Sequence, residues 1–187
     1  MILRTFFGAA AALTLCACVS TPPGPREYLD EQTAATITAA AQPLIFVNQN
    51  SGPVTRDSNR PRDYVELYGI DVNRMGTHRQ YIALLQWLAP EGASAQAPAL
   101  ELAVGTDTLH LEATVQDPKE LGIAQPLAQA YSSVSRWWYY PTDPATLKRI
   151  ASAHELRLTL DAPAGRSSYE MFSDGRAQLA ELTAVLP

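Results

Sequence analysis

Side chains that could carry acid–base or metal chemistry are thinly spread along this chain of 187 residues. Its three histidines, His78, His110 and His154, lie far apart, and we expect them at a turn, on an outward-facing strand position and at a helix end. The chain contains no HExxH, no GxSxG and no paired-cysteine spacing, the patterns that would fix metal ligands or a nucleophile in a defined geometry. We therefore predict no metal site, no cofactor and no catalytic residue.

One carboxylate and one imidazole are nevertheless expected to approach each other. Asp71 and His78 lie on the two strands of an expected hairpin over residues 63–88. A carboxylate beside an imidazole can support general acid–base catalysis. We favour the plainer interpretation, in which both are polar side chains near a turn.

Three arginines, Arg56, Arg60 and Arg62, lie in or next to a long polar segment over residues 48–61. Together they could contact a phosphate group or lipopolysaccharide. Asp57 and Asp63 lie among them and offset their charge. We interpret the segment as a solvated loop.

The most unusual cluster is the aromatic run Trp137-Trp138-Tyr139-Tyr140, which Tyr131 precedes. In a strand, successive side chains point to opposite faces, so Trp137 and Tyr139 share one face and Trp138 and Tyr140 the other. One pair belongs to the core. The second pair lies under the helix that follows, which we favour, or at the surface, where stacked aromatic rings bind sugars or a protein. These four residues are the candidate binding surface.

The first twenty residues indicate the compartment. Arg4 precedes the apolar run over residues 6–15, and the proline-rich residues 21–25 end it. A positive end, a short apolar stretch and small residues at its close are typical of a secretory signal. The run is shorter than the about 20 apolar residues that a membrane-spanning helix needs.

The sequence Leu15-Cys16-Ala17-Cys18 resembles the lipobox of bacterial lipoprotein precursors. The resemblance implies that Cys18 becomes the first mature residue and carries lipid on its thiol and its amine. Cys16 departs from the usual pattern, and the other register would place Leu15 before the cut, where a small residue is expected. The alternative is an ordinary cleaved signal that releases a soluble periplasmic protein. In such lipoproteins an Asp after the lipidated cysteine favours the inner membrane, so Val19 favours the periplasmic face of the outer membrane.

These signals divide the chain into three parts: a signal peptide over residues 1–17, a lipidated N-terminus with a proline-rich tether over residues 18–28, and a single β-rich domain over residues 29–187. Both cysteines lie before that domain, so its fold must be held without disulfides. The formal net charge of −5 argues against nucleic acid as a partner, because such proteins need a basic face. For the same reason the acyl chains, rather than surface charge, must hold the protein on the bilayer.

Alternation of apolar and polar residues predicts strands over most of the domain. The expected strands cover residues 33–38, 44–47, 132–140, 155–161 and 168–172, together with a hairpin over 63–88 that turns at 73–77 and a hairpin over 100–115 that turns at 105–107. Residues 118–121 suit a helical turn. Asp143, followed by a proline, predicts the start of a helix, and Asp174 predicts the start of a last helix whose buried stripe is Leu179, Leu182 and Leu186.

Many short strands and few helices predict a mainly-β fold, an antiparallel β-sandwich with two packed helices. An α+β sheet with both helices on one face is the alternative. We expect a non-catalytic, lipid-anchored lipoprotein that binds or scaffolds an envelope protein or a glycan. The rival hypothesis is an envelope hydrolase that uses carboxylates brought together by the fold.

Overall fold

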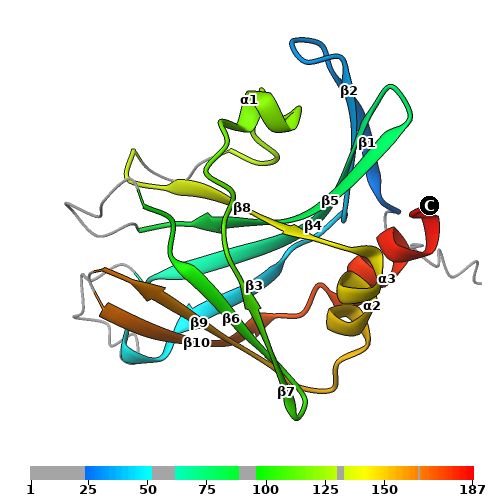
Figure 1. Ribbon diagram of the computed structural model, residues 1–187. Coiled ribbons are helices and arrows are strands. Elements are labelled where there is room, and N and C mark those ends of the chain that lie inside the picture. Colours follow the sequence, from blue (N-terminus) through cyan, green and yellow to red (C-terminus); the bar gives the residue numbers. More distant parts are fainter. Residues whose placement is uncertain (1–23, 52–61, 89–95, 130–132, 164) are drawn as a thin grey trace, which may run out of the picture.

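The computed structural model of the protein describes residues 24–51, 62–88, 96–129, 133–163 and 165–187 (Figure 1). In these ranges the chain forms ten strands and three helices. The strands are β1 (Arg26–Asp30), β2 (Ala35–Ala39), β3 (Leu44–Asn48), β4 (Tyr64–Arg74), β5 (Thr77–Gln86), β6 (Ala99–Val104), β7 (Asp107–Leu111), β8 (Arg136–Thr142), β9 (Leu156–Ala162) and β10 (Gly165–Ser173). The helices are α1 (Pro118–Leu121), α2 (Pro144–Ser152) and α3 (Arg176–Val185), and a 3-10 turn covers Gln49–Ser51.

Strand β4 is the centre of a single antiparallel sheet. One edge of β4 pairs with β5 along its length, and β5 pairs in turn with β8. The other edge divides, because its first half pairs with β3 and its second half with β2. Gly69 lies at the division and accepts a hydrogen bond from the Ala40 amide at 3.0 Å. A Cβ atom at Gly69 would lie 2.4 Å from Leu179 Cδ1, so glycine lets α3 pack directly on β4.

The longer arm of the sheet, β3-β10-β9-β6-β7, curls back over the main core (Figure 1). That core holds buried side chains from β3, β4, β5, β6, β8, β9 and β10 and from α2 and α3. After β7 the chain reaches the free edge of β8, where the Thr114 amide donates to the Tyr139 carbonyl at 2.8 Å. The predicted mainly-β fold with packed helices is confirmed, and its facing layers are two parts of one connected sheet.

A second core lies on the opposite face of β4, β5 and β8. Strand β2, which pairs with β4 in the sheet, also contributes to this core, and helix α1 and the residues after α1 pack on it. Beside this core lies Asp30, whose side chain is fully buried and accepts four backbone hydrogen bonds. Oδ1 accepts from Gln32 at 3.1 Å and Thr33 at 3.2 Å, and Oδ2 accepts from Ala124 at 2.6 Å and Gln125 at 2.9 Å. Asp30 therefore joins the β1–β2 turn to the segment after α1.

Both predicted hairpins are present. The β4–β5 turn differs in detail, because Met75 and Gly76 take positive φ values of 53° and 84°. Asn73 accepts a hydrogen bond from the Gly76 amide through Oδ1 at 2.9 Å. The pairing β6–β7 forms the second hairpin, and its strand ends at Leu111 rather than at residue 115.

The predicted start of α2 is confirmed, whereas that of α3 is wrong by one residue. Asp143 caps α2 by accepting from the Thr146 amide at 2.8 Å. The N-cap of α3 is Gly175 and not Asp174. A Cβ atom at Gly175 would lie 2.3 Å from the Pro43 carbonyl oxygen, so this corner packs too closely for any side chain.

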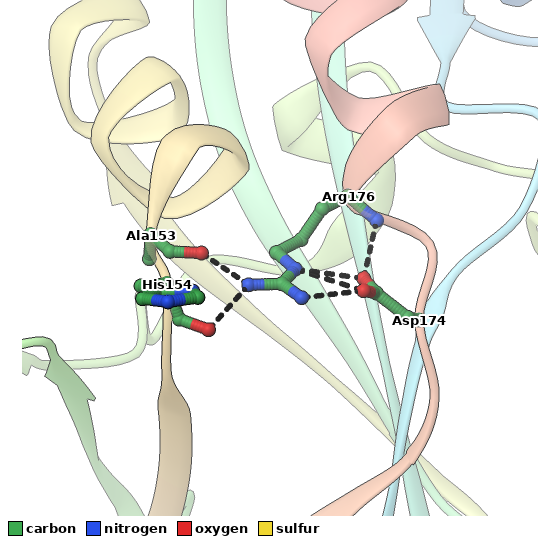
Figure 2. A network of polar contacts seen from close by, with 4 residues as sticks. All are labelled: Ala153, His154, Asp174 and Arg176. Carbon is green, nitrogen blue, oxygen red and sulfur yellow. Dashed lines mark hydrogen bonds and ion pairs between the residues drawn. The ribbon is translucent and has the colours of Figure 1, made fainter.

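Asp174 instead holds Arg176, as Figure 2 shows. Arg176 Nε donates to Asp174 Oδ1 at 2.8 Å, and Nη2 contacts Oδ2 at 2.5 Å. Its Nη1 donates to the carbonyls of Ala153 and of His154, the latter at 2.9 Å. The hydrogen bond from the Arg176 guanidinium is the main reason that the pKa of Asp174 lies below its usual value. The pair thereby fastens the start of α3 to the end of α2.

A candidate binding pocket beside strand β8

The predicted alternation of the aromatic strand is confirmed by the two cores. Trp137 and Tyr139 pack in or against the second core, and Trp138 and Tyr140 in or against the main core. Helix α2 contributes Leu147 to the main core. Of the two aromatic pairs, Trp138 and Tyr140 therefore share a core with the helix that follows, whereas Trp137 and Tyr139 pack in a core that the α1 segment joins and α2 does not.

The four aromatic residues differ in exposure. Tyr139 and Tyr140 are 5% and 0% exposed, whereas both tryptophans are half-buried. Burial raises the pKa of both tyrosines well above the usual value, with smaller contributions from Tyr28 and from Glu112 respectively. The two tyrosines are thus neutral core residues. Any ligand contact from this strand falls mainly to Trp137 and Trp138.

A pocket of about 330 Å³ borders the two tryptophans. One side is β8, and the other sides are the chain after β7, Pro118 and the approach to β6. The described lining consists of Gln96, Ala97, Glu112, Ala113, Thr114, Val115, Gln116, Pro118, Trp137, Trp138 and Tyr139. The hydrogen bond from Thr114 to Tyr139 fixes one wall against the other. The pocket is therefore formed where the two ends of the curled sheet meet.

The lining combines aromatic rings with amide, hydroxyl and carboxylate groups. Glu112 is its one charged side chain in the described residues. The indole N–H groups of Trp137 and Trp138 are buried and donate no hydrogen bond within the described chain. Both donors therefore remain open to a ligand or to water that enters the pocket. Val115 projects fully into solvent at the pocket.

The fold also brings Asp71 and His78 together. His78 Nδ1 lies 2.7 Å from Asp71 Oδ2, and Gln80 Nε2 donates to Asp71 Oδ1 at 2.7 Å. Asp71 is buried, and the His78 side chain is about one-third exposed. Within the described chain His78 makes no other side-chain hydrogen bond, and neither residue lines the pocket beside β8. Asp71 thus links two polar side chains of β5, one on each of its oxygens.

Glu66, a carboxylate on β4 that is only 1% exposed, was not predicted from the sequence. Its Oε2 accepts from the Tyr68 hydroxyl at 2.6 Å and its Oε1 from Trp87 Nε1 at 2.9 Å. The Tyr68 ring also packs on Trp137, with centroids 5.7 Å apart. Glu66 thus supports the strand face behind Trp137. The sequence signal for the burial of Glu66 was its position between Val65 and Leu67, in a strand that is apolar on both faces.

The remaining predicted residues do not gather into a site. His110 is exposed and lies 3.6 Å from Glu101, while His154 contributes only its carbonyl to Arg176. In the described ranges no three potential metal ligands cluster. Cys18, Arg56, Arg60 and Tyr131 lie outside the described residues.

No protein-family model, curated protein or solved structure matches the chain. Among the helices that the structure describes, none has the length and apolar character needed to cross a membrane.

Proposed function

We propose that this protein is a non-catalytic lipoprotein of the bacterial envelope that binds a glycan in the pocket beside β8. Acylated Cys18 would hold it at the periplasmic face of the outer membrane, with the proline-rich residues 21–25 as a spacer. The leader and its lipobox resemblance support the anchor. The observation that carries the binding role is the pocket between two half-buried tryptophans and the chain after β7.

The chemistry of the pocket favours a sugar. Indole rings offer flat apolar surface to the C–H faces of a pyranose, and Gln96, Thr114 and Gln116 offer donors and acceptors to its hydroxyl and acetamido groups. No cation lines the described pocket, which favours a neutral ligand over an anionic one. Glycan binding therefore uses every kind of group found there.

Binding fits this pocket better than hydrolysis of the glycan. Most glycosidases use a pair of carboxyl groups on opposite sides of the scissile bond. In the described lining Glu112 has no second carboxylate beside it. Glu66 and Asp71, the buried carboxylates on β4, accept hydrogen bonds elsewhere. We therefore assign the pocket to recognition.

Val115→Arg is expected to weaken glycan binding at least tenfold while leaving stability within about 0.5 kcal/mol, because Val115 is fully exposed but lines the pocket. Alanine at either tryptophan is a poorer test, since both rings pack on a core. The full-length protein in detergent micelles is titrated with soluble oligosaccharides from the cell wall, and tryptophan fluorescence is followed. Thermal melts accompany each titration.

The matched control is Val185→Arg, which makes the same change at an exposed apolar residue of α3 outside the pocket lining. This variant should bind like the wild type. Equal affinity in Val115→Arg and the wild type would contradict the proposed site. If no oligosaccharide changed the tryptophan fluorescence, the ligand would not be a glycan and the assignment would be withdrawn in favour of a protein ligand.

A further inference from the structure

A second hollow, of about 210 Å³, lies at the far end of the β4–β5 hairpin. Its lining is Val72, Arg74, Thr77, Arg79 and Leu121. In the hairpin register Val72 pairs with Arg79 and Arg74 pairs with Thr77, so these four side chains project from one face of the ribbon. The fifth, Leu121, comes from α1. The hollow shares no residue with the pocket beside β8.

The hollow is basic although the whole chain is acidic. Arg79 makes no side-chain hydrogen bond or ion pair within the described residues. Arg74 uses Nη1 to donate to the Glu120 carbonyl at 3.1 Å, and its other guanidinium N–H groups make no such bond there. No carboxylate belongs to the described lining. Two guanidinium groups and the Thr77 hydroxyl therefore offer donors that the described chain leaves unused.

The wall opposite the arginines is held firmly in place. Gly122 ends α1 with φ of 100°, and its carbonyl accepts from Thr33 Oγ1 at 2.8 Å. A Cβ atom on Gly122 would lie 2.9 Å from Val72 Cγ1 and 3.2 Å from Arg74 Cδ, so α1 packs directly against this end of β4. The hollow is thus preformed by the packing of α1 on the hairpin.

We propose that this hollow binds a phosphoryl group through Arg74 and Arg79. Guanidinium groups match phosphate oxygens in pairs of parallel hydrogen bonds, and two of them balance the charge of a phosphate dianion. Val72 and Leu121 give the site one apolar wall, while the side chains of Arg74, Thr77 and Arg79 are exposed and reachable from solvent. The volume lies below that of most sites for drug-sized ligands, so the group is a small phosphate or the phosphorylated end of a larger molecule.

The test is calorimetric titration of the full-length protein in detergent micelles with inorganic phosphate, with glycerol phosphate and with acetate, at constant ionic strength. The two phosphates are expected to bind at about 10 mM or below, and acetate at least tenfold more weakly. Arg79→Gln and Arg74→Gln should each weaken phosphate binding at least tenfold. Binding of glycerol phosphate but not inorganic phosphate would assign the site to esterified phosphate, which also supports the proposal.

The control is Arg157→Gln, at an exposed arginine of β9 that likewise makes no side-chain bond within the described chain. It should bind phosphate like the wild type, and melting curves should show all three variants folded. The proposal would be overturned if neither phosphate bound, if acetate bound as tightly as the phosphates, or if Arg79→Gln bound phosphate as tightly as the wild type. None of these outcomes depends on the pocket beside β8.

Discussion

Replacing Asp30 with alanine is expected to lower the free energy of unfolding by roughly 3–5 kcal/mol, because it removes the acceptor of four backbone N–H groups at once. Two of these donors, Gln32 and Thr33, lie in the β1–β2 turn, and the other two lie more than ninety residues away. Asp30 is fully buried, so solvent cannot easily replace it. The second core should loosen where β1, β2 and the α1 segment meet.

Urea denaturation of the wild type and of Asp30→Ala measures this loss. Asp30→Asn keeps one acceptor oxygen and should fall between them. Glu31→Ala is the control, since Glu31 is the exposed neighbour of Asp30, and it should change the free energy of unfolding by less than about 0.5 kcal/mol. If Asp30→Ala were as stable as Glu31→Ala, the four hydrogen bonds would not hold the second core.

The same carboxylate should make stability depend on pH. Burial by itself would raise the pKa of Asp30, but the N–H groups of Gln125, Ala124, Thr33 and Gln32 outweigh it and hold the pKa below its usual value. A lowered folded-state pKa stabilises the protein fully above the unfolded-state pKa of about 4, and this stabilisation is lost as the pH falls through the folded-state value. The stability difference between wild type and Asp30→Asn should therefore shrink at acid pH.

Cys18→Ala is expected to abolish lipid attachment completely. The lipobox resemblance implies that the Cys18 thiol is the acyl acceptor, and the acidic net charge of the chain does not favour electrostatic attraction to anionic lipid. Labelled palmitate should enter the wild type and not Cys18→Ala, which should accumulate as an unprocessed precursor. Detergent partition of the membrane fraction measures the same difference.

Cys16→Ala is the matched control, since it replaces the neighbouring cysteine of the same segment. It should be processed and labelled like the wild type. Equal labelling of the wild type and Cys18→Ala would contradict the anchor. Release of a processed, unlabelled wild-type protein into the periplasm would favour the ordinary cleaved signal instead.

Local signals in the sequence predicted much of the fold. The alternation of apolar and polar residues predicted the two hairpins, and Asp143 followed by a proline predicted the start of α2. Both features depend mainly on residues that are close together in the sequence. The helix start predicted at Asp174 was wrong by one residue, because the N-cap is Gly175, which lies too close to the Pro43 carbonyl to carry a side chain. Asp174 Oδ1 nevertheless accepts a hydrogen bond from the Arg176 amide at 3.0 Å, so the local signal for a helix start was real.

The candidate sites were only partly predictable. Alternation divided the aromatic strand correctly between two faces, yet it could not show that the chain after β7 returns to the free edge of β8 and forms the pocket wall. Arg74 and Arg79 look like ordinary solvated strand residues in the sequence. They line a hollow only because α1, more than forty residues later, packs beside them. Such long-range placements leave no periodic signal.

The most direct test of the proposed function is a photo-crosslinking amino acid placed at Val115 in whole cells, with the same amino acid at Val185 as the control. We predict that the Val115 protein, and not the Val185 protein, becomes attached to cell-wall glycan, and that digestion by a glycan-cleaving enzyme releases it. Crosslinks from Val115 only to other proteins, or equal glycan attachment from both positions, would contradict a glycan site beside β8.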